Sequence, residues 1–143
     1  MSYIMPRPDP RTLSPEDVDI SMLAFDITRS VRDYLGSASG ATLTPAHILA
    51  FSQRAWRLNP AHADGCGLIL AVCRTPDLNR RQVMGVFRRG RGGTDRFMNS
   101  PVDTPNRYVV LLEPADEEEW NRFTGHFLPD RKPGEANPVR YFE

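Results

Sequence analysis

The sequence predicts an α+β fold in which N-terminal helices pack on a small, mainly antiparallel sheet that is followed by a C-terminal helix. Two observations support this class. Apolar residues recur at spacings of three and four in the first third of the chain, and short apolar runs bounded by turn residues follow in the middle. A mostly α-helical fold is the alternative, because some of the middle runs also fit helices.

The size and composition predict one globular domain. The chain has 143 residues, of which 40% are hydrophobic and 25% charged, which is ordinary for a domain with a full core. Both ends are rich in proline and lack apolar periodicity. We therefore expect an N-terminal arm (residues 1–13), a globular domain (14–128) and a C-terminal tail (129–143), with both terminal segments lying on some other surface.

Two pairs of a capping residue and proline predict helix starts. The pair at residues 14–15 is followed by two acids, and the helix it opens ends before Gly36. The pair at residues 44–45 opens a second helix that runs to about Leu58. The first helix carries a continuous apolar stripe, made by Ile20, Leu23, Ile27, Val31, Tyr34 and Leu35.

Three apolar runs in the second half favour strands. Residues 65–74 fit a strand buried on both faces, with a helix as the alternative. Residues 82–88 form either a second strand or the end of a helix. Residues 107–113 are the clearest strand, because β-branched and aromatic side chains dominate them and turn residues flank them.

A last helix is predicted after Pro114. The four acids at residues 116–119 would lie in its first turn, where they complement the helix dipole. Trp120, Phe123 and Phe127 would then share one face.

The charge is unevenly distributed, although the formal net charge is zero. Residues 54–107 carry ten arginines against four acids, whereas residues 1–53 and 108–143 carry an excess of acids. A neutral total argues against general polyanion binding by the whole molecule, so the basic middle is the feature to explain.

An arginine- and glycine-rich stretch at residues 86–97 is the candidate binding site. Guanidinium groups on such backbone can bind phosphate or carboxylate through paired hydrogen bonds. We expect contacts from Arg88, Arg89, Arg91 and Arg96, with Phe97 and Tyr141 as aromatic anchors. The alternative is that these arginines pair with Asp95, Asp103 or the acidic run 113–119 of the same chain.

The function expected from these features is non-catalytic. The chain would be a binding or accessory protein that docks on a larger assembly, contacting an acidic protein surface or nucleic acid. A small enzyme that clamps an anionic substrate, using His126 or Cys66, is one alternative. Another alternative is a self-assembling subunit, in which the basic middle segment of one copy contacts the acidic terminal segments of neighbouring copies.

No cofactor or metal is expected, because the chain lacks a Gly-Lys-Ser/Thr phosphate loop, a dinucleotide fingerprint and metal-ligand spacing. Cys66 and Cys73 are interpreted as unpaired core residues, since their spacing does not suit a disulfide. Without a secretory leader or a long apolar segment, we expect a cytoplasmic protein that does not enter membranes.

Overall fold

The α+β class is confirmed by the computed structural model. Within the described residues it has three α-helices, one five-stranded sheet and one three-stranded sheet, which excludes the mostly α-helical alternative. The described residues are 8–14, 17, 21–37, 42–53, 56–57, 65–75, 80–89, 97–99, 107–129 and 139–142.

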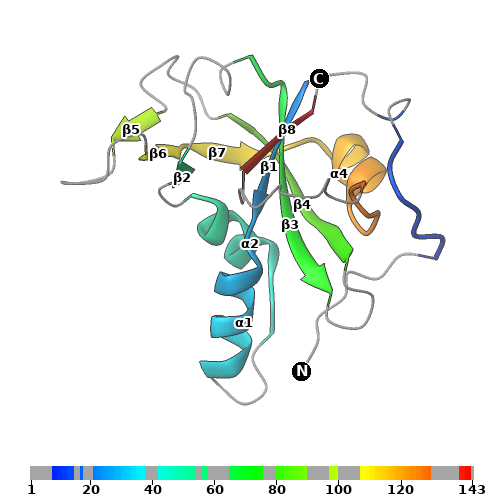
Figure 1. Cartoon of the computed structure of the whole chain (residues 1–143), viewed down its shortest axis with the longest axis horizontal. Coiled ribbons are helices and arrows are strands. Elements are labelled where there is room, and N and C mark those ends of the chain that lie inside the picture. The colour runs from blue at the N-terminus through cyan, green and yellow to red at the C-terminus, as the bar shows by residue number, and fades with distance from the viewer. Residues whose placement is uncertain are drawn as a thin grey trace.

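The five-stranded sheet forms the centre of the molecule, with the strand order β7-β4-β3-β1-β8 (Figure 1). Strands β1 and β3 run parallel, and the other three neighbouring pairs run antiparallel, so the sheet is mixed and mainly antiparallel. Its members are β1 (Met22–Asp26), β3 (Leu68–Thr75), β4 (Arg80–Arg89), β7 (Leu112–Pro114) and β8 (Val139–Phe142).

Helices cover both faces of this sheet. The helices α1 (Thr28–Ser37) and α2 (Pro45–Ser52) lie on one side, and α4 (Glu117–Phe123) lies on the other (Figure 1). Alternate residues of β1 supply the two cores, as the twofold side-chain period of a strand requires. Leu23 and Phe25 pack with residues of α1 and α2, whereas Met22 and Ala24 pack on the side of α4.

The prediction of one helix from residue 15 to residue 35 is wrong. Residues 22–26 form β1, and α1 begins only at Thr28. The reason is burial on both faces: Met22 through Phe25 are at most 1% exposed, and β1 lies between β3 and β8. The apolar run that had been interpreted as a widened helical stripe is therefore an inner strand.

The second helix ends earlier than predicted. It is capped by Thr44 as expected, but it stops at Ser52. The indole Nε1 of Trp56 donates a hydrogen bond of 2.8 Å to the carbonyl of Ser52, which is the group that would accept the backbone N–H of residue 56 in a continued helix. The Trp56 ring stacks on Phe25 with ring centroids 4.7 Å apart, so core packing stabilises the break.

The strand prediction for residues 65–74 is confirmed by β3, and residues 82–88 lie in β4. Residues 107–113 form two strands rather than one, because β6 ends at Val110 and β7 begins at Leu112. Between these two strands the chain leaves the three-stranded sheet, which contains β6, and enters the five-stranded sheet, which contains β7. The three-stranded sheet has the order β2-β6-β5 and contains β2 (Trp56–Arg57), β6 (Arg107–Val110) and β5 (Phe97–Asn99).

Two segments pair with the same edge of the long strand β4: residues 126–128 near its start and β7 near its end. Near its start, the N–H of Val83 donates to the carbonyl of His126 and the N–H of Leu128 donates to the carbonyl of Arg81, at 2.8 and 2.9 Å. Near its end, β4 pairs with β7. The backbone of residues 11–13 pairs with Phe127, and residues 139–142 pair with β1. These described parts of the two terminal segments therefore lie against the domain itself rather than on another surface.

The last helix begins as predicted but is shorter than expected. It ends at Phe123, so Phe127 does not share a helical face with Trp120 and Phe123 and instead pairs through its backbone with Thr12 and Gln82. Asp116 caps α4 by accepting the backbone N–H of Glu119 at 2.8 Å, and three glutamates occupy the first turn. Arg122 lies in the last turn, so both ends of α4 carry charges that stabilise the helix dipole.

Candidate functional site

The arginine-rich stretch begins as regular structure. Val86 and Phe87 are buried in β4, which continues through Arg88 and ends at Arg89. Arg91 and Arg96 lie outside the described residues. The structure therefore bears on two of the four predicted arginines.

Arg88 is paired within the chain. Its Nε donates to Oε1 of Glu119 at 2.9 Å, and its Nη2 donates to Oε2 of the same carboxylate. These hydrogen bonds are the main reason why the pKa of Arg88 is raised above its ordinary value. For Arg88, the structure thus favours the alternative in which the acidic run neutralises the arginine. Its side chain remains 45% exposed.

Arg89 is half-buried, and its backbone lies opposite Leu112 of β7. The residue before it, Arg88, lies opposite Glu113. The end of β4 therefore has carboxylates beside it on both β7 and α4, which reduces the local positive potential.

The two predicted aromatic anchors belong to strands at sheet edges. Phe97 begins β5, which is the last strand in the order β2-β6-β5, and Tyr141 lies in β8, the last strand in the order β7-β4-β3-β1-β8. Tyr141 pairs with Leu23 of β1 through the backbone. An edge strand has one row of backbone N–H and C=O groups outside its own sheet.

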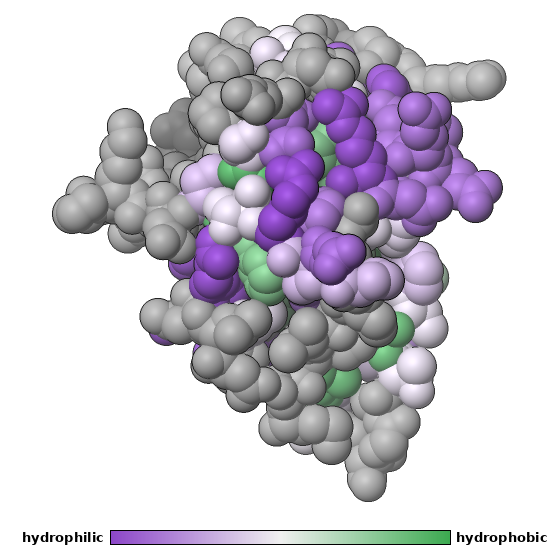
Figure 2. Space-filling model, turned by 90° about the vertical axis from the view of Figure 1, so that its right-hand side faces the viewer, coloured by the Kyte–Doolittle hydropathy of each residue, from purple (hydrophilic) through white to green (hydrophobic). Residues whose placement is uncertain are grey.

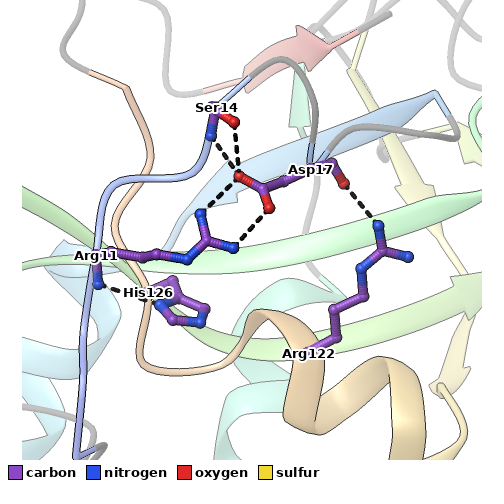
Figure 3. Close-up of polar contacts among 5 residues, drawn as sticks. All are labelled: Arg11, Ser14, Asp17, Arg122 and His126. Atoms are coloured by element: carbon purple, nitrogen blue, oxygen red, sulfur yellow. Dashed lines mark hydrogen bonds and ion pairs between the residues drawn. The ribbon is translucent and has the colours of Figure 1, made fainter.

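A polar network on the α4 side was not predicted from the sequence. Residues 11–14, here called the strap, are held by Asp17 (Figure 3). The carboxylate accepts hydrogen bonds from both terminal nitrogens of Arg11, at 2.8 and 2.6 Å, and from the N–H and hydroxyl of Ser14, at 2.6 and 3.0 Å. The pair with Arg11 is the main cause of a pKa of Asp17 well below its usual range, and Ser14 adds to it.

The same network anchors the strap to the domain. Arg122 of α4 donates to the backbone carbonyl of Asp17 at 3.1 Å, and the backbone N–H of Arg11 donates to Nδ1 of His126 at 3.2 Å (Figure 3). Ser14, followed by Pro15 and two acids, is the signal that predicted a helix start here. In the structure, the backbone N–H of Asp17 donates to the carbonyl of Ser14 at 2.9 Å. They form a hydrogen-bonded turn instead.

The residues considered for catalysis are buried. His126 is 4% exposed, and its Nδ1 accepts a backbone N–H, which leaves that nitrogen unsuited to act as a base. Cys66 is 1% exposed, and burial raises the pKa of the Cys73 thiol to about 11. The backbone of His126 meets β4 at Val83, about 16 Å along the strand from Arg88. Among the described residues, Arg88 therefore does not lie beside His126 as an anion clamp next to a base would require.

A second group of arginines lies at the opposite end of β4. Arg74 of β3 is directly opposite Arg81 of β4, and Nε of Arg81 donates to Oδ2 of Asp26 at 2.9 Å. Arg29 and Arg32 lie on α1, which follows β1 at the same end of the sheet. More than forty positions separate Arg29 and Arg32 from Arg74 and Arg81 in the sequence, so inspection for adjacent arginines did not find this group.

The α4 side is mostly hydrophilic. In Figure 2, hydrophilic residues cover most of the described surface on this side, and hydrophobic residues form only small patches. Such a surface favours polar or charged contacts over a large apolar interface.

Other site classes find no support among the described residues. No three histidine, cysteine, aspartate or glutamate side chains there form a group suited to a metal ion. No helix in that part of the chain is long and apolar enough to cross a membrane. No family model matches the sequence, and no curated protein or solved structure has significant similarity to it.

Proposed function

We propose that this protein is a non-catalytic binding or accessory protein that docks on a larger assembly. Contact would come from residues 86–97 and from the terminal segments, and the partner would present an acidic protein surface or nucleic acid. This proposal assigns no chemical step to the protein.

The observation that carries the proposal is the position of the two aromatic anchors. Phe97 and Tyr141 lie in β5 and β8, which end their sheets. Edge strands can accept a partner strand through backbone hydrogen bonds, while neighbouring side chains select the partner. Arg89 and the arginines of residues 90–96 would supply charge-assisted contacts, which improve orientation and association rate.

The ion pair of Arg88 limits its contribution. An anionic partner would compete with Glu119 for this guanidinium, although about half of the Arg88 side chain is reachable by solvent. Removing the carboxylate should therefore strengthen partner binding. This expectation distinguishes a binding role of Arg88 from a purely structural one.

Two alternatives are less favoured. An enzyme with an arginine clamp would need an accessible base or nucleophile, whereas His126, Cys66 and Cys73 are buried. A self-assembling subunit would join basic and acidic segments between copies, whereas Arg88 and Glu119 join them within one chain.

The test is affinity purification of the full chain from its native host, with identification of the captured partner, with and without nuclease. The variants are the triple substitution of Arg88, Arg89 and Arg91 by Ala, and Glu119→Gln. We expect the triple variant to keep its melting temperature and capture less partner, and Glu119→Gln to capture more. Unchanged capture by both variants would refute the proposal. Persistence of the complex after nuclease treatment would identify a protein partner.

A further inference from the structure

The outer edge of residues 126–128, here called the 126–128 edge, is covered by the strap. The other edge of these residues pairs with the start of β4. On the strap side, the N–H of Leu13 donates to the carbonyl of Phe127 at 2.8 Å, and the N–H of Phe127 donates to the carbonyl of Arg11 at 2.9 Å. Thr12 and Phe127 thereby form a parallel bridge. The strap binds this edge in the way that an added strand binds the edge of a sheet.

Leu13 is the apolar anchor of the strap. Its side chain is 3% exposed and belongs to a buried cluster on the α4 side of the sheet. The other buried members of this cluster come from β1, β3 and β4, from Phe123 of α4 and from Leu128. The rest of the domain therefore supplies the apolar surroundings of this leucine, and burial of a leucine makes a large contribution to the binding of a short segment.

Polar side chains of the domain hold the other three residues of the strap. The carboxylate of Asp17 binds the guanidinium of Arg11 and the hydroxyl of Ser14. Nη2 of Arg80 donates to the hydroxyl of Thr12. The site thus has a separate contact for an arginine, for two hydroxyl side chains and for a leucine. Backbone pairing combined with side-chain selection is a general mode of binding extended peptides.

Prolines keep the strap short. Pro10 precedes Arg11, and Pro15 follows Ser14. Proline has no backbone N–H, so neither proline can donate a further hydrogen bond to the 126–128 edge. Residues 8–11 are exposed. Short exposed segments with few backbone hydrogen bonds open more readily than the core of a domain, so the strap can leave while the edge beneath it stays paired with β4.

We propose that the 126–128 edge is a docking site for an extended segment of a partner protein, and that the strap is its intramolecular competitor. The partner segment carries a leucine that takes the place of Leu13 and an arginine two residues before it. The strap itself supports this assignment, because it shows which side chains the site accepts. This site is separate from residues 86–97, β5 and β8 and does not depend on their role in docking.

Competition by the strap sets the apparent affinity of the site. A partner segment binds only those molecules in which the strap is displaced, so its apparent dissociation constant is the intrinsic constant divided by the displaced fraction. A tethered competitor acts at an effective concentration in the range of about 1 mM, which closes the site to weak ligands. Weakening the strap should therefore strengthen the binding of a separate peptide, and a strap with a structural role alone would not give this result.

The test adds a fluorescent peptide with the sequence of residues 8–14 to the full chain and measures anisotropy. Leu13→Ala removes the anchor of the strap and keeps the site, so this variant should bind the peptide at least about tenfold more tightly than the wild type. The peptide should also raise the melting temperature of Leu13→Ala, because its leucine fills the vacated position. The same peptide with alanine in place of its leucine should have neither effect.

Two further variants complete the experiment. Ile48→Ala removes a buried side chain of the same size from the core on the opposite face of the sheet, so it should lower stability without any gain in affinity for the peptide. Arg11→Ala changes an exposed residue of the strap and should fold even where Leu13→Ala does not. Because it removes the ion pair with Asp17, it should bind the peptide about two- to fivefold more tightly than the wild type.

Three results would overturn the inference. The first is the absence of peptide binding by both strap variants. The second is equal binding or equal thermal stabilisation of Ile48→Ala, which would indicate affinity for any loosened core. The third is a wild-type dimer that the peptide dissociates, which would assign the site to a second copy of the chain instead of a partner protein.

Discussion

Glycine 85 in β4 offers a direct test of the packing between the sheet and α2. A Cβ atom at this position would lie 2.9 Å from Cγ2 of Ile48 and 3.0 Å from two ring carbons of Phe87. Both neighbours are at most 2% exposed, so neither can turn outward to make room. Gly85→Ala should therefore overpack the core.

The expected change in the free energy of unfolding of Gly85→Ala is the sum of two opposing contributions. Overpacking by one methyl group costs about 1–3 kcal/mol, and the reduced freedom of the unfolded chain returns about 0.4–1 kcal/mol. The net loss should be about 1–2 kcal/mol, which corresponds to a decrease in melting temperature of about 3–8 °C for a domain of this size.

The assay is urea unfolding followed by the emission of Trp56 and Trp120, and a matched glycine serves as control. Gly36 lies near the end of α1, and a Cβ there would meet no atom within 4 Å. Gly36→Ala should therefore stabilise the protein by about 0.5 kcal/mol through helix propensity. Equal stability of Gly85→Ala and the wild type, or equal losses for both alanine variants, would refute the packing argument.

Two further predictions concern acid stability and thiol reactivity. The pKa of Asp17 is lowered by Arg11 and Ser14, so its ion pair stabilises the fold above the unfolded pKa of about 4 and this stabilisation is lost as the pH falls. Asp17→Asn should therefore be less stable than the wild type at pH 7, and urea unfolding at several pH values should show the difference shrinking towards about pH 2; a constant difference would contradict this reasoning. Cys66 and Cys73 are at most 3% exposed, so a thiol reagent at about pH 8 should label neither in the native protein and both in urea; labelling of either before unfolding would show that the burial is wrong.

The sequence predicted most clearly the element that local signals specify. Residues 117–123 formed the expected helix, because a capped acidic turn specifies its structure locally, and residues 68–75 formed the strand that was favoured over a helix. Residues 22–26 did not form the expected helix, because an inner strand and the buried face of a helix present the same apolar side chains. Only pairing with β3 and β8, which are distant in the chain, resolves that choice.

The candidate site was predicted less completely for a related reason. The pairing of Arg88 with Glu119 spans 31 positions, so the sequence could offer it only as an alternative. The backbone of Arg74 meets Thr28 at the start of α1 across 46 positions of sequence, a contact that exists only after β1 and β3 align in parallel. Charge sums over segments detect an excess of arginine but do not show which guanidinium groups lack a carboxylate.

The pairing of β1 with β8 has a consequence for synthesis of the protein. Strand β1 leaves the ribosome long before β8, which follows it by more than one hundred residues. During that interval β1 can pair with β3, but its other side has no partner from the same chain. Nascent copies on one messenger RNA would therefore risk association through this side, and a chaperone that shields it until translation ends would raise the yield of folded protein.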